Sequence, residues 1–151
     1  MNIINILMII LSAPIFYMLS WVWHEFCHCL EYFRQGSTEC KIDVYKSTMR
    51  VTGNYDDNHT AVAYAGGIYS GITFLGLGLF AMYTPTLWDT WLEYFGITLG
   101  AMQIFYGIFE GNFLEKWYGN WKYNLRYLIY IGTILGGTIL YWNKLIEFIN
   151  L

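Results

Sequence analysis

The chain has 151 residues, of which 56% are hydrophobic, 21% are aromatic and only 13% are charged. Soluble domains carry about 25% charged residues, so this composition excludes an ordinary water-soluble domain and indicates a lipid environment. The formal net charge of -3 argues against nucleic acid as a partner. No linker-like stretch or repeat interrupts the chain, so we predict one membrane-embedded domain over residues 1–151.

Four apolar runs are long enough to be considered as membrane spans, at residues 3 to about 33, 61–83, 91–109 and 125–142. The tryptophans lie near the predicted span ends, where an indole suits the lipid interface: Trp21, Trp23, Trp88, Trp91, Trp117, Trp121 and Trp142. Glycines recur in the second and fourth runs, including two Gly-x-x-x-Gly spacings that predict tight helix packing. We therefore predict an all-α integral membrane protein with about four transmembrane helices in a lipid bilayer.

The basic residues predict the orientation of these spans. They concentrate after the first run and around the connection from the third to the fourth: Arg34, Lys41, Lys46, Arg50, Lys116, Lys122 and Arg126. Only Lys144 lies on the other side. The positive-inside rule then predicts that both connections face the cytoplasm and that both termini lie outside. This topology places the ends of the first and third spans on one membrane face.

A small β-hairpin is predicted after the first span. Residues 40–45 and 48–52 have strand-like composition, and Gly53-Asn54 follows as a turn. The cysteines Cys27, Cys29 and Cys40 form an odd set, and the first two are one residue apart on a helix, where they cannot pair with each other. We therefore expect no disulfide framework, and expect the thiols to be small buried apolar residues.

The sequence His24-Glu25-Phe26-Cys27-His28 ends the first apolar run. Its two imidazoles, four residues apart, share one helix face, where both can bind one Zn²⁺ while Glu25 reaches a water molecule as general base. Imidazoles and a carboxylate at the edge of the hydrocarbon are costly unless they pair or bind a metal. The competing interpretation is a pair of interfacial histidines near the end of a long helix.

A catalytic zinc usually has three protein ligands, so a third ligand must come from elsewhere in the chain. We predict Glu110, because it ends the third run on the same membrane face as His24 and His28. Five other residues remain open as the third ligand: Glu31, Cys40, Asp56, Asp57 and His59. Gln103 is predicted as a possible oxyanion stabiliser through its amide, although helix-helix hydrogen bonding is the commoner task of such a residue.

The chain resembles the site-2 protease family of intramembrane zinc metalloproteases. Three elements carry the resemblance: His24-Glu25-Phe26-Cys27-His28, Ala65-Gly66-Gly67 and Phe109-Glu110-Gly111. The resemblance implies that His24, His28 and Glu110 bind zinc, that Glu25 is the general base, and that the hairpin holds an unwound substrate strand. The chain departs from the family in having Glu for the usual Asp ligand, no Asn-Pro element before it and no PDZ-like domain.

The function expected from these features is hydrolysis of peptide bonds in membrane-associated protein or peptide substrates, with the active site toward the cytoplasmic side. The alternative is a non-catalytic membrane subunit that packs within a larger complex, with or without a structural metal. Assembly with a second copy or with another partner stays open, and the sequence does not identify the substrate.

Overall fold

The computed structural model describes residues 3–45, 48–55, 57–84, 89–117 and 121–150. It contains four long helices and one hairpin after the first helix, as the sequence predicts. In chain order the elements are α1 (Ile3–Arg34), β1 (Cys40–Tyr45), β2 (Thr48–Gly53), α2 (His59–Tyr83), α3 (Asp89–Trp117), the short 3-10 helix η1 (Trp121–Leu125) and α4 (Arg126–Asn150).

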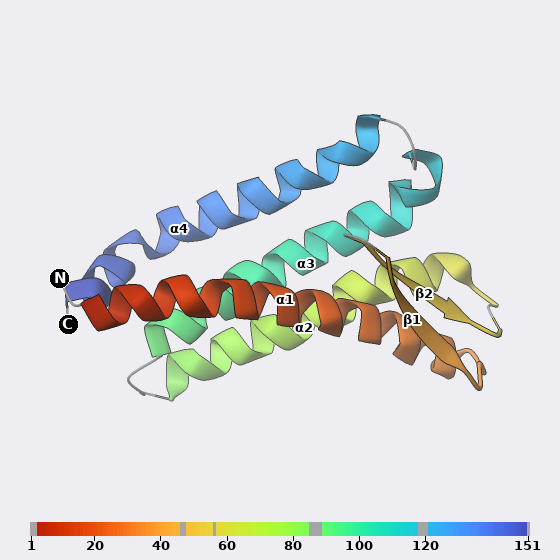
Figure 1. The fold of residues 1–151 in the computed structure, drawn as a ribbon, viewed down its shortest axis with the longest axis horizontal. Coiled ribbons are helices and arrows are strands. Elements are labelled where there is room, and N and C mark those ends of the chain that lie inside the picture. The colour runs from red at the N-terminus through yellow and green to blue at the C-terminus, as the bar shows by residue number, and fades with distance from the viewer. Residues whose placement is uncertain (1–2, 46–47, 56, 85–88, 118–120, 151) are drawn as a thin grey trace.

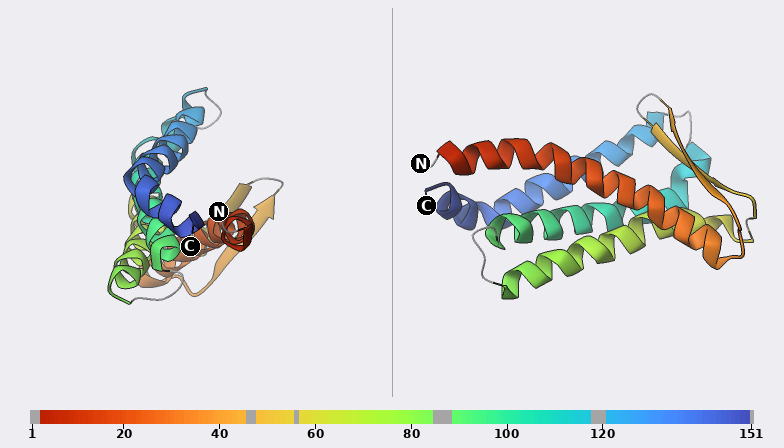
Figure 2. Two further views of the ribbon diagram at one scale, coloured as in Figure 1. Left: turned by 90° about the vertical axis from the view of Figure 1, so that its left-hand side faces the viewer. Right: turned by 60° about the horizontal axis from the view of Figure 1, so that its bottom comes forward.

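The four helices run lengthwise in alternating directions, and both chain termini lie at the same end of the bundle (Figures 1 and 2). The hairpin lies at the opposite end, beside the last turns of α1. Within the described part of the chain, three helices are long and apolar enough to cross a membrane: α1, α2 and the Asp89–Phe113 part of α3. By the same measure α4, the fourth predicted span, is not among them.

The core centres on α3, which packs against both α2 and α4. Ten buried residues form one apolar cluster there: Phe74, Trp91, Tyr94, Phe95, Leu99, Met102, Tyr106, Phe109, Tyr130 and Phe148. Trp91 lies near the start of α3, belongs to this core and donates its Nε1–H to Ser12 Oγ (2.7 Å), so its indole faces the bundle and not the lipid. Trp88 lies outside the described residues. On the outside of α1, by contrast, large apolar side chains such as Leu7, Leu11 and Met18 are exposed, which suits a lipid-facing surface.

Glycines allow α2 and α3 to pack with their backbones in contact. A Cβ atom on Gly67 would collide with the backbone of Gly107, and one on Gly96 would collide with the backbone of Gly78. Membrane helices use small residues for this close approach, so the predicted tight packing is confirmed for α2. In α4 the outcome is mixed: an added Cβ on Gly132 or Gly136 would meet nothing within 4 Å, whereas one on Gly137 would collide with the Thr98 side chain of α3.

The end of α1 turns the chain back upon the helix. Gly36 has a φ of 103°, the left-handed conformation that favours glycine. The N–H of Ser37 donates to Tyr32 O (3.0 Å) and the N–H of Gly36 donates to Phe33 O (3.1 Å), which is the Schellman arrangement of a helix C-terminus. The antiparallel hairpin follows, with Cys40 paired with Gly53 at its open end.

This reversal brings Cys40 beside α1, where it forms a disulfide bond with Cys29. The Cα atoms of the two residues are 5.6 Å apart, inside the range that a disulfide can bridge. The expectation that the cysteines stay unpaired is therefore wrong for this pair. Two cysteines on one helix, such as Cys27 and Cys29, cannot pair with each other. The turn at Gly36, however, brings Cys40 back to Cys29, eleven positions earlier in the chain. Cys27 is free and buried, as predicted.

Candidate metal centre

Two helices bring His24, His28 and Glu110 together. The histidines lie four residues apart on α1 and are 1% and 5% exposed. Glu110 comes from α3, which does not end there as predicted but continues for about two turns to Trp117. The Nε2 atoms of the two histidines are 3.1 Å apart. Glu110 Oε2 lies 3.0 Å from Nε2 of His24 and 3.6 Å from Nε2 of His28. Among the described residues, these three form the one group of potential ligands close enough to share a metal ion.

The backbone of α2 fixes the tautomer of His28. Its Nδ1 lies 2.6 Å from the carbonyl oxygen of Val62. A carbonyl oxygen only accepts hydrogen bonds, so Nδ1 carries the proton and donates it. In the neutral imidazole, Nε2 then presents its lone pair to His24 and Glu110.

Gln103 fixes His24 in the same way. The amide Nε2 of Gln103 donates to the backbone oxygen of Ser20 (3.3 Å), which turns its Oε1 toward His24. The Nδ1–H of His24 donates to that Oε1 at 2.8 Å. Gln103 is fully buried, so water does not compete for this bond. Nε2 of His24 consequently also presents a lone pair to the centre.

Three electron-pair donors therefore converge without a proton assigned to any of them. If one imidazole carried a proton on Nε2, that nitrogen could donate a hydrogen bond to Glu110. The lone pair on Nε2 of the other imidazole would still have no donor or cation of its own. A cation satisfies all three atoms at once. Tetrahedral zinc with bonds of about 2.0–2.1 Å holds its ligand atoms about 3.4 Å apart, close to the three observed separations. The donor set of two imidazoles and one carboxylate, with a fourth position open, fits a zinc ion.

Helix α2 closes one side of this centre. A Cβ atom on Gly66 would collide with the ring of His28 and would lie 2.8 Å from Nε2 of His24. Any side chain at this position would therefore fill the space beside the two ligand nitrogens. The sequence indicated Gly66 through the family resemblance and helix packing, but its contact with both histidines depends on the pairing of α1 with α2.

Glu25 lies next to the pair and is 8% exposed. Among the described residues no group hydrogen-bonds its carboxylate, although it interacts electrostatically with His24, His28 and Glu110. The other buried acidic residues of the described chain are bound to partners; Glu93, for example, pairs with Lys144 at 3.1 Å. A carboxylate beside the centre without a hydrogen-bond partner is available to accept a proton from a water molecule.

The rival third ligands lie elsewhere or are engaged. Glu31 accepts hydrogen bonds from Arg34 (2.6 and 2.7 Å), Gln35 (3.0 Å) and Tyr69 (3.0 Å). Cys40 is bonded to Cys29. Asp57 and His59 are exposed around the start of α2, and Asp56 lies outside the described residues.

The structure shows Gln103 in helix-helix hydrogen bonding, the commoner task considered for it in the sequence, with a candidate ligand as one of its partners. Both ends of its amide are engaged, with Ser20 and with His24, so it holds an imidazole in place. Its predicted role as an oxyanion stabiliser stays a prediction. Only the register between α1 and α3 aligns this side chain with Nδ1 of His24.

Comparisons with models of known protein families, with curated proteins and with solved structures found no match. A function is therefore inferred from the geometry of the centre and from the residues that resemble the site-2 protease family.

Proposed function

We propose that this protein is an intramembrane zinc metallopeptidase. The observation that carries the proposal is the convergence of the two Nε2 lone pairs of His24 and His28 with Glu110 Oε2, at 3.0 to 3.6 Å. The outer nitrogen of each imidazole is already committed to a hydrogen bond. Such second-shell bonds orient histidine ligands in zinc proteins.

The residues around the centre supply the parts that amide hydrolysis needs. A zinc ion held by His24, His28 and Glu110 would polarise a carbonyl group and would lower the pKa of a water molecule toward about 7. Glu25 accepts a proton from the attacking water and passes it to the leaving amine, the role of the Glu in this motif. Gln103 and the Val62 carbonyl hold the two imidazoles during these proton transfers.

The position of the centre favours a membrane-associated substrate. At 1.5 Å per residue, His28 lies about 9 Å before the C-terminal end of α1, inside a helix that is long and apolar enough to cross a bilayer. At this depth the centre lies within reach of a peptide segment that is still inside the membrane. The basic residues at the hairpin end favour a cytoplasmic position for this side.

Zinc content tests the metal centre directly. We expect about one zinc per chain in detergent-purified protein, because three neutral or anionic donors face one point. His24→Ala and Glu110→Ala each remove a donor, so both variants lose the metal. Glu25→Gln keeps it, since Glu25 is not a ligand in this arrangement. Elemental analysis of the four proteins, purified in parallel, measures this.

Peptide hydrolysis tests the reaction. Labelled unstructured peptides in mixed micelles serve as the probe, and the zinc-loaded Glu25→Gln protein serves as the matched control. We expect the substitution to lower the hydrolysis rate by about 100-fold or more, because it removes the proton acceptor. If the unmodified chain binds no zinc even after reconstitution, the peptidase proposal fails. The alternative of a non-catalytic membrane subunit would then account better for the chain.

A further inference from the structure

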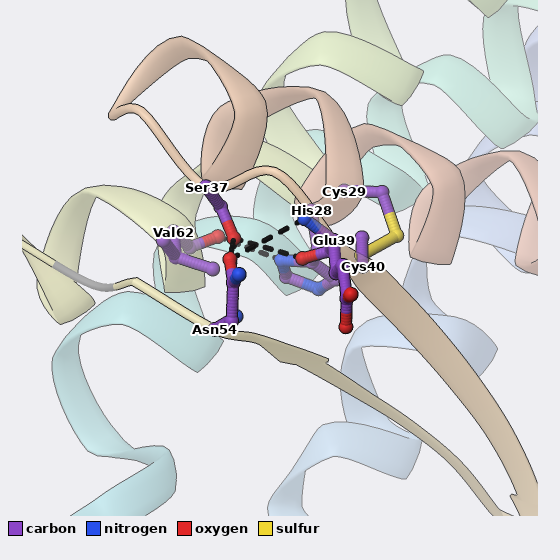
Figure 3. The surroundings of a disulfide bond; sticks show 7 residues. All are labelled: His28, Cys29, Ser37, Glu39, Cys40, Asn54 and Val62. Carbon is purple, nitrogen blue, oxygen red and sulfur yellow. Dashed lines mark hydrogen bonds between the residues drawn. A yellow bond between two sulfur atoms is a disulfide. The ribbon is translucent and has the colours of Figure 1, made fainter.

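The disulfide lies directly beside the candidate metal centre. Cys29 follows His28 on α1, and Cys40 is the first residue of β1 (Figure 3). The bond therefore attaches the hairpin to the same helical turn that carries a candidate ligand. The basic residues predict, by the positive-inside rule, that this end of the molecule lies on the cytoplasmic side. Disulfides on that side of a membrane are rare and are usually transient or redox-sensing.

The two cysteines of the bond are not equally exposed. Cys29 is only 4% exposed, whereas Cys40 is half-buried on the hairpin. An incoming thiolate therefore reaches Sγ of Cys40 more readily, with Cys29 as the leaving group. This asymmetry gives the exchange reaction a defined direction of attack.

A second, polar anchor holds the base of the hairpin. Asn54 Oδ1 accepts the backbone N–H groups of Thr38 (3.0 Å) and Glu39 (3.3 Å), and Ser37 Oγ donates to the same oxygen at 2.5 Å. Gly53 packs against the ring of Tyr32, where an added Cβ would collide. Cleavage of the disulfide leaves these contacts in place, so the hairpin stays attached at its base while β1 is released from α1.

We propose that Cys29–Cys40 is a reversible thiol–disulfide exchange site for a low-molecular-weight thiol, and that its reduction loosens the hairpin and the helical turn that carries His28. The effect on metal binding rests on the proposed zinc function, whereas the exchange and the loosening do not. The bond thus couples the redox state of the compartment to how firmly a candidate ligand is held.

The reaction balances as two successive exchanges. The thiolate of a first small thiol bonds to Sγ of Cys40, the Cys29–Cys40 bond breaks, and Cys29 leaves as a thiolate that takes up the proton. A second small thiol then attacks the mixed disulfide. Cys40 leaves as a thiol, and the two small thiols depart as their own disulfide. The protein gains two electrons and two protons, and the small thiols supply them.

Full-length protein in detergent, loaded with zinc, tests the proposal against glutathione buffers of graded reduced-to-oxidised ratio. Alkylation followed by mass measurement counts the free thiols. Trypsin cleavage at the exposed Lys41 and Arg50 reports the hairpin, and a chelator measures the rate of zinc release. As the buffer becomes reducing, we expect the free thiols to rise from one to three. Hairpin cleavage and zinc release should both accelerate several-fold at the same ratio.

Two variants separate the disulfide from other effects. Cys40→Ser should behave as the reduced protein in every buffer, with fast hairpin cleavage and fast zinc release. Cys27→Ser removes the other cysteine and should keep the full response, because Cys27 is not part of the bond.

Resistance of the bond to strongly reducing glutathione would overturn the proposal and make the disulfide a permanent staple. Unchanged hairpin cleavage and zinc release after reduction would overturn it as well. A chain that binds no zinc would refute the proposed function and the effect on metal binding, while the alkylation and trypsin readouts would still decide whether the exchange site exists.

Discussion

Two hydrogen bonds from neighbouring helices determine what His24 and His28 can bind. Gln103 Oε1 of α3 and the Val62 carbonyl of α2 each accept a hydrogen bond from the Nδ1–H of one imidazole. Without these bonds either ring could turn its N–H toward the centre and repel a cation. The motif alone supplies the imidazoles, and the surrounding helices make them lone-pair donors.

The hydrogen bond from His24 to Gln103 predicts a measurable loss on substitution. Gln103→Leu removes the acceptor that holds His24, so we expect zinc affinity to fall by about 10- to 100-fold. Competition with a chromophoric chelator measures the affinity. Met102→Leu is the matched control, because Met102 is the fully buried neighbour on α3 and the swap conserves volume. Equal zinc affinity in the two variants would contradict the positioning role.

At the scale of elements, the contact between α2 and α3 places Glu110. Gly67 meets the Gly107 backbone one turn before Glu110, and Gly66 meets the histidine rings of α1. Gly66 and Gly67 of α2 thus set the distances from α2 to α1 and to α3, the two helices that carry the candidate ligands. A shift of α3 would change the distances from Glu110 Oε2 to the two histidine nitrogens, which are 3.0 and 3.6 Å.

Two glycines of α2 offer a matched test of this contact. Gly67→Ala should lower stability by about 1–3 kcal/mol, since its Cβ overpacks a filled space. It should also weaken zinc binding by displacing Glu110. Gly76→Ala adds the same Cβ where nothing lies within 4 Å, so we expect neutral or slightly raised stability from helix propensity. Thermal unfolding in detergent and zinc titration compare the two. Identical behaviour would show that the close packing does not control the site.

At the scale of the whole molecule, four alternating helices return the C-terminus to the end where the N-terminus lies (Figure 1). Lys144 of α4 pairs with the buried Glu93 of α3, with Nζ 3.1 Å from both carboxylate oxygens, near the end of the bundle that carries the termini. This contact ties α4 along α3 although α4 is not one of the three helices that qualify as candidate spans.

Reporter fusions decide whether α4 spans the membrane. We expect reporters at the N- and C-termini to lie on the same, external side, because α4 runs the length of the bundle beside α3. A reporter in the connection between β2 and α2 should lie in the cytoplasm and serves as the control. Termini on opposite sides would mean that only three helices cross, with α4 lying at the surface.

The sequence by itself determined the helices, the hairpin and the His24-Glu25-x-x-His28 motif. Apolar run length, strand-like composition and a spacing of four on a helix are local properties, so residues close together in the chain carry them. Glu110 was also predicted in advance, because a run of apolar residues fixes which membrane face its end reaches. The same reasoning left five rivals open, since sharing a face does not specify contact.

Only the tertiary structure separated Glu110 from those rivals, bonded Cys29 to Cys40 and gave Gln103 and Gly66 their places around the histidines. These relations depend on helix register and on the chain reversal at Gly36. They join residues that are not neighbours in the sequence at distances of 2.8 to 5.6 Å, where a shift of one turn would break them. The Gly-x-x-x-Gly spacing predicted close packing of α2, but a local pattern does not say which residues of another helix lie opposite.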